Sequence, residues 1–202
     1  MDRPVRRAYL DMISKQVGPA LKAAGFKRSS GTFRLRSGDG DAIVLEFQGS
    51  GSSGGDLSLF YLNMAASTGG FLRWQATRGF VEAPRLPRTM PSQWWNRLDA
   101  APDFVDAVVP GFPIGRDTWR LTSPKAAKRC GDLLAAALPA RILPQIEKIL
   151  DHYRQIDDAL RAGQVVLPPP PSTALGGFHF VKKPDHPYLA WALSESGGSH
   201  GG

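Results

Sequence analysis

Hydrophobic positions near the start of the chain recur at spacings of three and four, which is the period of an amphipathic helix. The pattern covers residues 5–24 and is interrupted by Gly18-Pro19. Because proline cannot donate the helical hydrogen bond, we expect a kink there, or two short helices that meet. Gly25 stands where a C-terminal cap belongs, and Phe26 follows it as a buried anchor.

Strand-like patterns follow this helix and predict an antiparallel sheet. Most of these stretches alternate apolar and polar side chains, and one is apolar on both faces, as in a central strand. We expect a turn at residues 68–70 before the fourth strand. The predicted strands are residues 32–36, 42–48, 57–65 (apolar on both faces), 71–77 and 117–122.

Capping residues and prolines predict further helices in the second half of the chain. Serine or aspartate before an apolar stripe is typical of a helix start, and proline fits the first turn. The predicted helices run from Ser92 to Leu98, from Pro102 to before Pro110, onward from Ser123-Pro124, onward from Pro144, and from Asp151 to Gly163.

Together these elements predict an α+β fold. We expect an antiparallel β-meander of four to five strands, with the N-terminal helix on one face and C-terminal helices after it. Residues 1–163 would form a single domain and residues 164–177 a proline-rich linker. Residues 178–193 would be an extension that either docks on the domain or does not, and residues 194–202 a disordered tail.

The net charge of +7 belongs to the start of the chain. Residues 1–36 hold nine Lys and Arg side chains against two Asp, whereas the remaining residues are balanced. A local positive field favours anionic partners, although charge alone reads no sequence, and a solvated face is the alternative. The candidate anion-binding residues are Arg3, Arg6, Arg7, Lys27, Arg28, Arg34 and Arg36.

Cysteine content and hydropathy indicate a compartment. The chain has one cysteine, Cys130, which cannot form an internal disulfide and fits a reducing environment. No continuous apolar region follows the N-terminus, and no run of 18 apolar residues could span a membrane. We therefore expect a cytoplasmic protein without a membrane partner, and its oligomeric state stays open.

Aromatic and basic residues interleave between residues 85 and 97, which is a composition typical of partner surfaces. The alternative is that the tryptophans close the core over the end of the sheet, since large aromatic side chains are mostly buried. The candidate partner-binding residues are Arg85, Arg88, Trp94, Trp95 and Arg97.

Three motifs suggest chemistry, and each is better explained structurally. Gly49, Gly51 and Gly54 match G-x-G-x-x-G, but a strand pattern follows where a dinucleotide site needs a helix. Cys130 lies on an apolar helix stripe. His179 and His186 lack further ligands at metal spacing. We therefore predict no catalytic residue, no cofactor and no metal site.

Seven short segments match the motifs of one known family. They are Leu21-Lys22-Ala23-Ala24-Gly25-Phe26-Lys27-Arg28, Thr32-Phe33-Arg34, Phe47-Gln48, Phe60-Tyr61-Leu62-Asn63-Met64, Trp95-Asn96-Arg97-Leu98, Asp117-Thr118-Trp119-Arg120 and Leu143-Pro144. Through them the chain resembles a bacterial family of unknown function, DUF4304. The resemblance covers roughly residues 10–162, and it implies a fold without an established activity. The Gly/Ser loop at residues 49–55 departs from the family pattern.

Three hypotheses for function follow from these patterns. The leading one is a non-enzymatic module that binds a protein, such as a toxin or a defence component, through a sheet face or the region of Trp94 and Trp95. The second is nucleic-acid binding through residues 1–36. The third is an enzyme whose polar groups meet only on folding, which a pocket holding His152 or His179 beside a carboxylate would favour.

Overall fold

A computed structural model describes residues 4–54, 56–79, 87–105 and 116–197. The chain divides into two compact units, and each is described by itself. Unit 1 consists of Met1–Arg34, Leu45–Met64 and Arg97–Leu143. Unit 2 consists of Leu35–Val44, Ala65–Asn96 and Pro144–Gly202.

The described strands form one antiparallel sheet, which confirms the predicted α+β class. The order is β1-β2-β3-β4-β5-β7, and β6 pairs with β4. The hairpin, the central strand and the strand near residue 119 were predicted, whereas β1, β5 and the sheet pairing of β7 were not. The bounds are β1 (Lys27–Ser29), β2 (Thr32–Arg36), β3 (Ala42–Gly49), β4 (Ser58–Ser67), β5 (Trp94–Arg97), β6 (Trp119–Leu121) and β7 (Phe178–His179).

The N-terminal helix of unit 1 is continuous but changes its winding. It consists of α1 (Pro4–Asp11), the π-helical η1 (Met12–Val17) and α2 (Gly18–Ala23). Gly18 N–H bonds to the carbonyl of Ile13, five residues back, and Pro19, which has no N–H, follows in the first turn of α2. The predicted interruption is therefore a wider turn within the helix.

The end of this helix lies at Gly25, as the sequence predicts. Gly25 has φ +89°, a conformation that favours glycine, and its N–H bonds to the carbonyl of Lys22. Phe26 N–H bonds to the carbonyl of Leu21, and the Phe26 side chain is buried. These bonds satisfy carbonyls that the helix end would otherwise leave unpaired.

Buried aromatic side chains contact one another in the core of unit 1. The ring of Phe60 lies 5.1 Å from that of Tyr9 and 5.8 Å from that of Trp119. Phe104, in the short 3₁₀ helix η2 (Pro102–Phe104), also stacks on Trp119. Helix α4 (Pro124–Ala137) packs against α1 and η1. It begins as predicted, because Ser123 Oγ accepts the N–H of Ala126.

The fourth predicted strand is instead a helix, α3 (Gly69–Thr77) of unit 2. Thr68 Oγ1 accepts the N–H of Phe71 as an N-cap, and Asp41 Oδ1 accepts the N–H of Gly69. Residues 68–70 thus start a helix, although a turn was predicted there. The alternation at residues 72–76 suggested a strand, but the local Thr68 cap and the distant Asp41 together fix a helix start.

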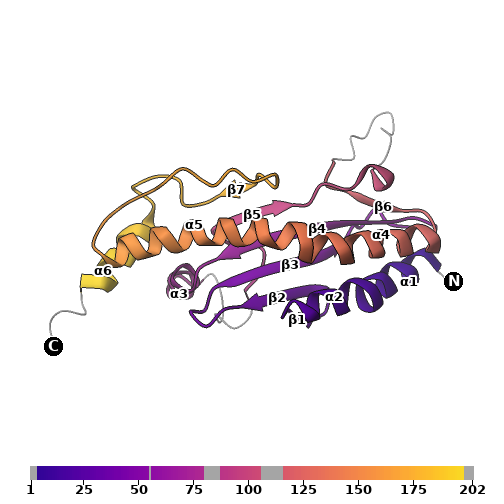
Figure 1. The fold of residues 1–202 in the computed structure, drawn as a ribbon, viewed down its shortest axis with the longest axis horizontal. Helices are drawn as coiled ribbons and strands as arrows, with labels where there is room; N and C mark the ends of the chain where they lie inside the picture. Colours follow the sequence, from indigo (N-terminus) through magenta and orange to yellow (C-terminus); the bar gives the residue numbers. More distant parts are fainter. Residues whose placement is uncertain (1–3, 55, 80–86, 106–115, 198–202) are drawn as a thin grey trace. The chain divides into compact units, whose positions relative to one another are not determined.

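The predicted helix at residues 92–98 is instead strand β5. Ser92 does not cap a helix, since its hydroxyl lies 2.8 Å from the carbonyl oxygens of both Thr89 and Trp94 and its single proton is directed to them. Strand β5 pairs with β7 beside it (Figure 1), where Trp94 faces His179 and Trp95 faces Phe178. Pairing with a segment more than 80 residues away decides this element, and local propensity does not reveal it.

One long helix, α5 (Leu143–Arg161), replaces the two segments predicted after Pro144. Asp151 lies inside it and accepts a hydrogen bond from Arg154, one turn later, so it is not a cap. The turn η3 (Leu138–Ile142) is π-helical and immediately precedes α5. The predicted end of the helix that begins near Pro102 lies outside the described residues.

The segment after α5 contacts strand β5 within unit 2. Trp94 Nε1 donates to the carbonyl of Gly176, and Phe180 N–H bonds to the carbonyl of Gln93. Helix α6 (Pro187–Gly197) lies against α3. The helix extends past Ser194, where the disordered tail was expected to begin, and residues 198–202 lie outside the described part. The proposed domain boundary at residue 163 stays a prediction.

Replacing Gly69 by alanine should destabilise the fold, because a Cβ there would lie 2.2 Å from the backbone carbonyl oxygen of Asp39. We expect a loss of about 1–3 kcal/mol in the free energy of unfolding by urea. Gly38→Ala is the matched control, since nothing lies within 4 Å of its added Cβ. Equal stability of the two variants would contradict this packing.

Candidate functional site

A hydrogen-bonded group of polar side chains lies on strands β3, β4 and β5 and the approach to β6 in unit 1. We call it the Arg97 network, and its centre is the guanidinium of Arg97. Arg97 Nε donates to Asn63 Oδ1 at 3.1 Å, and Arg97 Nη1 lies 2.9 Å from Asp117 Oδ2. The remaining members are Glu46, Gln48 and Tyr61.

Asn63 is the buried member of the network, with 3% of its surface exposed. Its amide donates to Gln48 Oε1 at 2.8 Å and to Glu46 Oε2 at 3.2 Å, while its oxygen accepts from Arg97. Residues two apart on a strand share a face, so Glu46 and Gln48 reach the same amide. The partners satisfy a group whose burial would otherwise be unfavourable.

Tyr61 and Asp117 hold the guanidinium from its other sides. The guanidinium carbon of Arg97 lies 4.2 Å from the centre of the Tyr61 ring, which is a cation–π contact. The side chains of Arg97 and Asp117 are 33% and 28% exposed, so solvent weakens their ion pair. The result is a positioned guanidinium against an aromatic ring, both half exposed.

Such an arrangement is suited to recognition. Arginine and tyrosine are enriched among residues that contribute most to binding energy, and a side chain already held in place loses less entropy on binding. A planar guanidinium also carries a positive charge that attracts carboxylates. The chemistry that Arg97 and Tyr61 offer is therefore charge and stacking with a ligand.

Sequence reasoning found only part of this network. It named Arg97, but within a patch with Trp94 and Trp95, and it did not single out Tyr61 or Asn63. The available signal was the polar Asn63 in an otherwise apolar strand. Four of the segments that carry the family resemblance each contribute to the network, namely those ending in or containing Gln48, Asn63, Arg97 and Asp117.

The other predicted partner-binding residues have different environments in unit 2. Trp94 is fully buried, as the core-closing alternative proposed, so its indole does not reach the surface. Trp95 is half-buried and Arg88 is exposed, while Arg85 lies outside the described residues. A partner surface at Trp95 and Arg88 stays a prediction.

The predicted anion-binding residues are mostly at the surface, and their role stays a prediction. Arg6 lies over the ring of Tyr9 and Arg28 over that of Phe33, each at 5.5 Å. Arg28 Nε also donates to the carbonyl of Ser30. The others have these positions: Arg7 and Lys27 are exposed, Arg34 is half-buried, Arg36 is exposed and belongs to unit 2, and Arg3 is not described.

Cys130 and the glycine-rich loop occupy structural positions. Cys130 is fully buried in α4, and burial raises the pKa of its thiol to about 12. The loop after β3 leads into strand β4, and not into the helix that a dinucleotide site needs. Across the described ranges, no group of three His, Cys, Asp or Glu side chains could hold a metal ion.

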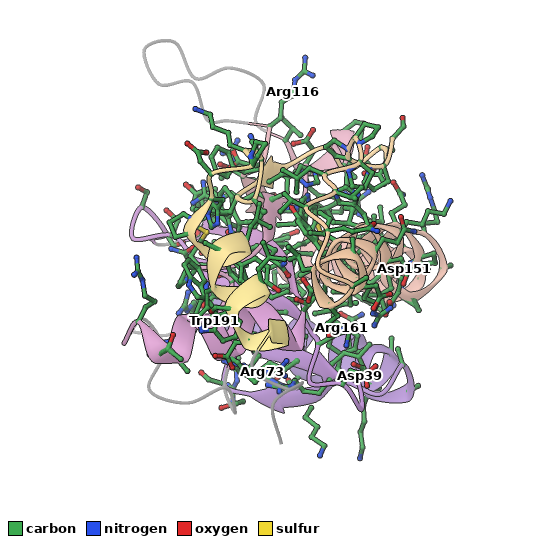
Figure 2. All side chains as sticks on the ribbon, turned by 90° about the vertical axis from the view of Figure 1, so that its left-hand side faces the viewer. Asp39, Arg73, Arg116, Asp151, Arg161 and Trp191 are labelled. Carbon is green, nitrogen blue, oxygen red and sulfur yellow. The ribbon has the colours of Figure 1, made fainter. Side chains whose placement is uncertain are left out.

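Unit 2 contains a cavity of about 260 Å³ among α3, α5 and α6. Arg73, Arg161 and Trp191 lie around it at the end that faces the viewer in Figure 2. Asp157 accepts a hydrogen bond from the hydroxyl of Tyr188 at 2.5 Å inside it. Burial raises the pKa of Asp157, while its hydrogen bonds to Thr68 and Tyr188 oppose this. Asp157 thus helps to join the start of α3 to α5 and α6.

Comparison with protein families decides where the chain belongs. The model of a domain of unknown function, DUF4304, matches residues 17–147. The chain belongs to the DUF4304 family. Comparisons with curated proteins and with solved structures gave no match. The DUF4304 region contains every member of the Arg97 network, whereas most of α5 and all later residues follow it.

No helix among the described residues is long and apolar enough to cross a membrane.

Removing the Arg97 side chain should leave the buried oxygen of Asn63 without its donor. We expect Arg97→Ala to lower the free energy of unfolding by about 1–3 kcal/mol. Asp117→Ala should cost less than about 1 kcal/mol, because it removes only a partly exposed ion pair. Urea denaturation measures both variants, and an equal or larger loss for Asp117→Ala would show that Asn63 does not depend on Arg97.

The Cys130 thiol of the native DUF4304 protein should resist modification. At neutral pH a buried thiol with a raised pKa holds almost no reactive thiolate. Ellman's reagent should label about one thiol per chain in denaturant and react far more slowly with native protein. Rapid labelling of the native protein would contradict the burial of Cys130.

Proposed function

We propose that this DUF4304 protein is a non-enzymatic binding module that recognises a protein partner through the Arg97 network. The observation that carries the proposal is the positioned pair of Arg97 and Tyr61. Both side chains are partly exposed, and the buried amide of Asn63 holds the guanidinium in place. Binding would therefore not require these groups to be ordered first.

The charge of unit 1 indicates the chemistry of the partner. Unit 1 has 15 Lys and Arg and nine Asp and Glu in its sequence ranges, which gives a net charge of +6. Unit 2 carries the remaining +1. A positive surface speeds encounter with negative partners and disfavours basic ones. The proposed partner is an acidic protein in the cytoplasm, such as a toxin or a component of a defence system.

Affinity capture from nuclease-treated host lysate tests this proposal. Tagged wild-type protein should retain an acidic protein, and a photo-crosslinking residue at position 61 should form a covalent link with it. Arg97→Gln should reduce capture at least about tenfold, which corresponds to the loss of one good interfacial contact. Circular dichroism and urea denaturation would confirm that the variant is folded.

Arg129→Ala is the matched control, because it also removes one arginine from unit 1 but from an exposed position on α4. Capture that survives in this variant and fails in Arg97→Gln supports the proposal. Equal capture by the two variants would overturn the proposal. So would the absence of a crosslink between position 61 and the captured protein.

Nucleic-acid binding through the basic start of the chain is the second candidate, and the charge in residues 1–36 favours it. It predicts that nuclease treatment abolishes capture and that affinity falls steeply with salt. Reversing the charges of Arg3, Arg6 and Arg7 should then remove binding, while Arg97→Gln should leave it unchanged.

A further inference from the structure

A second site lies in unit 2, outside the region that matches the family. It is a cavity of about 470 Å³, which is within the usual range for small-molecule sites. His152 and Ile156 of α5 form one wall, and residues 167–170 form another. His179 of β7 and Lys182 just after it complete the lining. We call this cavity the imidazole pocket.

The protonation of His179 follows from its hydrogen bonds. The hydroxyl of Tyr153 lies 2.7 Å from the carbonyl oxygen of Gln93 and 2.8 Å from His179 Nδ1. The hydroxyl has one proton, and the carbonyl can only accept, so Tyr153 donates to Gln93. His179 Nδ1 must then carry the proton that Tyr153 accepts. Nε2 is left with the lone pair and can take up a proton or bind a ligand.

His152 is the second imidazole of the pocket. The residue is 7% exposed, and none of the hydrogen bonds found in the described part of the chain involves its ring. Its ring nitrogens are not among the fully buried polar atoms, so they remain accessible from the pocket that His152 lines. Its ring centre lies 6.3 Å from that of His179, and the two planes are perpendicular. The two rings are therefore neighbours, and both line the same cavity, where one polar group can approach them from the open side.

The charges around the pocket determine the sign of that group. The titratable groups that meet the two imidazoles are each other, Tyr153 beside them on α5, and Lys182. The carbonyl of Gln93, the residue before β5, carries no charge and accepts from the Tyr153 hydroxyl. Among the described residues that line the pocket there is no carboxylate. A cation would therefore lack a counter-charge, whereas an anion would meet Lys182 and two groups that can become cationic.

The rest of the lining is apolar. Ile156, Leu167, Pro168 and Val181 surround the imidazoles, and proline rings and branched side chains give a wall without hydrogen-bond donors. A ligand that fills the pocket would place an apolar body against this wall. Its polar end would then be directed to His152 and His179.

We propose that the imidazole pocket binds a small molecule with an oxyanion group on an apolar body, the oxyanion accepting hydrogen bonds from His152 and His179. Lys182 at the rim adds charge, since its side chain is exposed and Nζ lies 4.3 Å from the centre of the Phe178 ring. This site is independent of the Arg97 network, and it assigns no reaction to the chain.

Protonation should accompany binding. Burial lowers the pKa of both imidazoles, and the charge that His152 carries when protonated and that of Lys182 lower the pKa of His179 further. Each ring is therefore mainly neutral near pH 7. A bound anion favours the charged form, so binding takes up protons and affinity rises as pH falls. Benzenesulfonate suits the test because its own charge does not change in this range.

Titration of the full-length protein with benzenesulfonate, followed by NMR of the histidine ring protons, tests the proposal. The signals of His152 and His179 should shift, and affinity should rise at least about tenfold between pH 7.5 and pH 5.5, as the uptake of one proton implies. Phenyl phosphate and benzoate show which oxyanion is preferred. Benzyl alcohol, which has no charge, should bind far more weakly than any of them.

Three variants make the test specific. His152→Gln and His179→Gln should each weaken binding at least about tenfold. His186→Gln is the matched control, since burial also lowers the pKa of His186, but its ring packs on Trp74 outside the pocket. Lys182→Gln changes an exposed residue and should weaken binding several-fold without affecting folding. Absent binding at pH 5.5, affinity independent of pH, or equal affinity in His152→Gln and His186→Gln would overturn the proposal.

Discussion

The buried amide of Asn63 is the constraint on which the account of unit 1 depends. An amide enclosed in a central strand is unfavourable unless its donors and acceptor find partners. Gln48 and Glu46 on β3 accept from it, and Arg97 donates to it from β5. The same bonds also specify register, because a shift of one residue in either strand would turn the partner to the other face. Satisfying one buried group therefore positions Arg97.

Unit 2 uses a related arrangement at the start of helix α3. Asp41 is almost fully buried, and its two oxygens accept from the N–H of Gly69 and from Arg154 Nε. Thr68 caps the helix and Asp157 lies close by, so negative groups meet the positive end of the helix dipole. The close approach of Asp39 leaves space only for glycine at position 69. Buried polar groups in both units thus determine where elements meet.

Local patterns predicted the elements that local interactions decide. The Gly25 cap, the hairpin after it and the start of α4 at Ser123 each depend on residues a few positions apart. The segment that forms helix α3 has the pattern of a strand, and the segment that forms strand β5 has the pattern of a helix. Asp41 fixes the start of α3, and pairing with β7 fixes β5. Neither contact is visible in a window of ten residues.

The candidate sites show the same limit. The aromatic and basic composition of residues 85–97 pointed to Arg97. Gln48, Asn63 and Asp117 lie within segments that resemble the family. No spacing rule could join four segments spread over 70 residues into one network. The sequence offered no reason to place His152 and His179 together. They share one pocket because β7, which carries His179, returns to pair with β5 near helix α5, which carries His152. The described residues that line that pocket include Lys182 and no carboxylate.

A double-mutant cycle between Asn63 and Arg97 tests the central claim most directly. The free energies of unfolding of Asn63→Ala, Arg97→Ala and the double variant give the coupling between the two side chains. If the buried amide holds the guanidinium, the double variant should lose less than the sum of the single losses, by about 1–2 kcal/mol. Losses that add to within about 0.3 kcal/mol would contradict the account, because the two residues would then act independently.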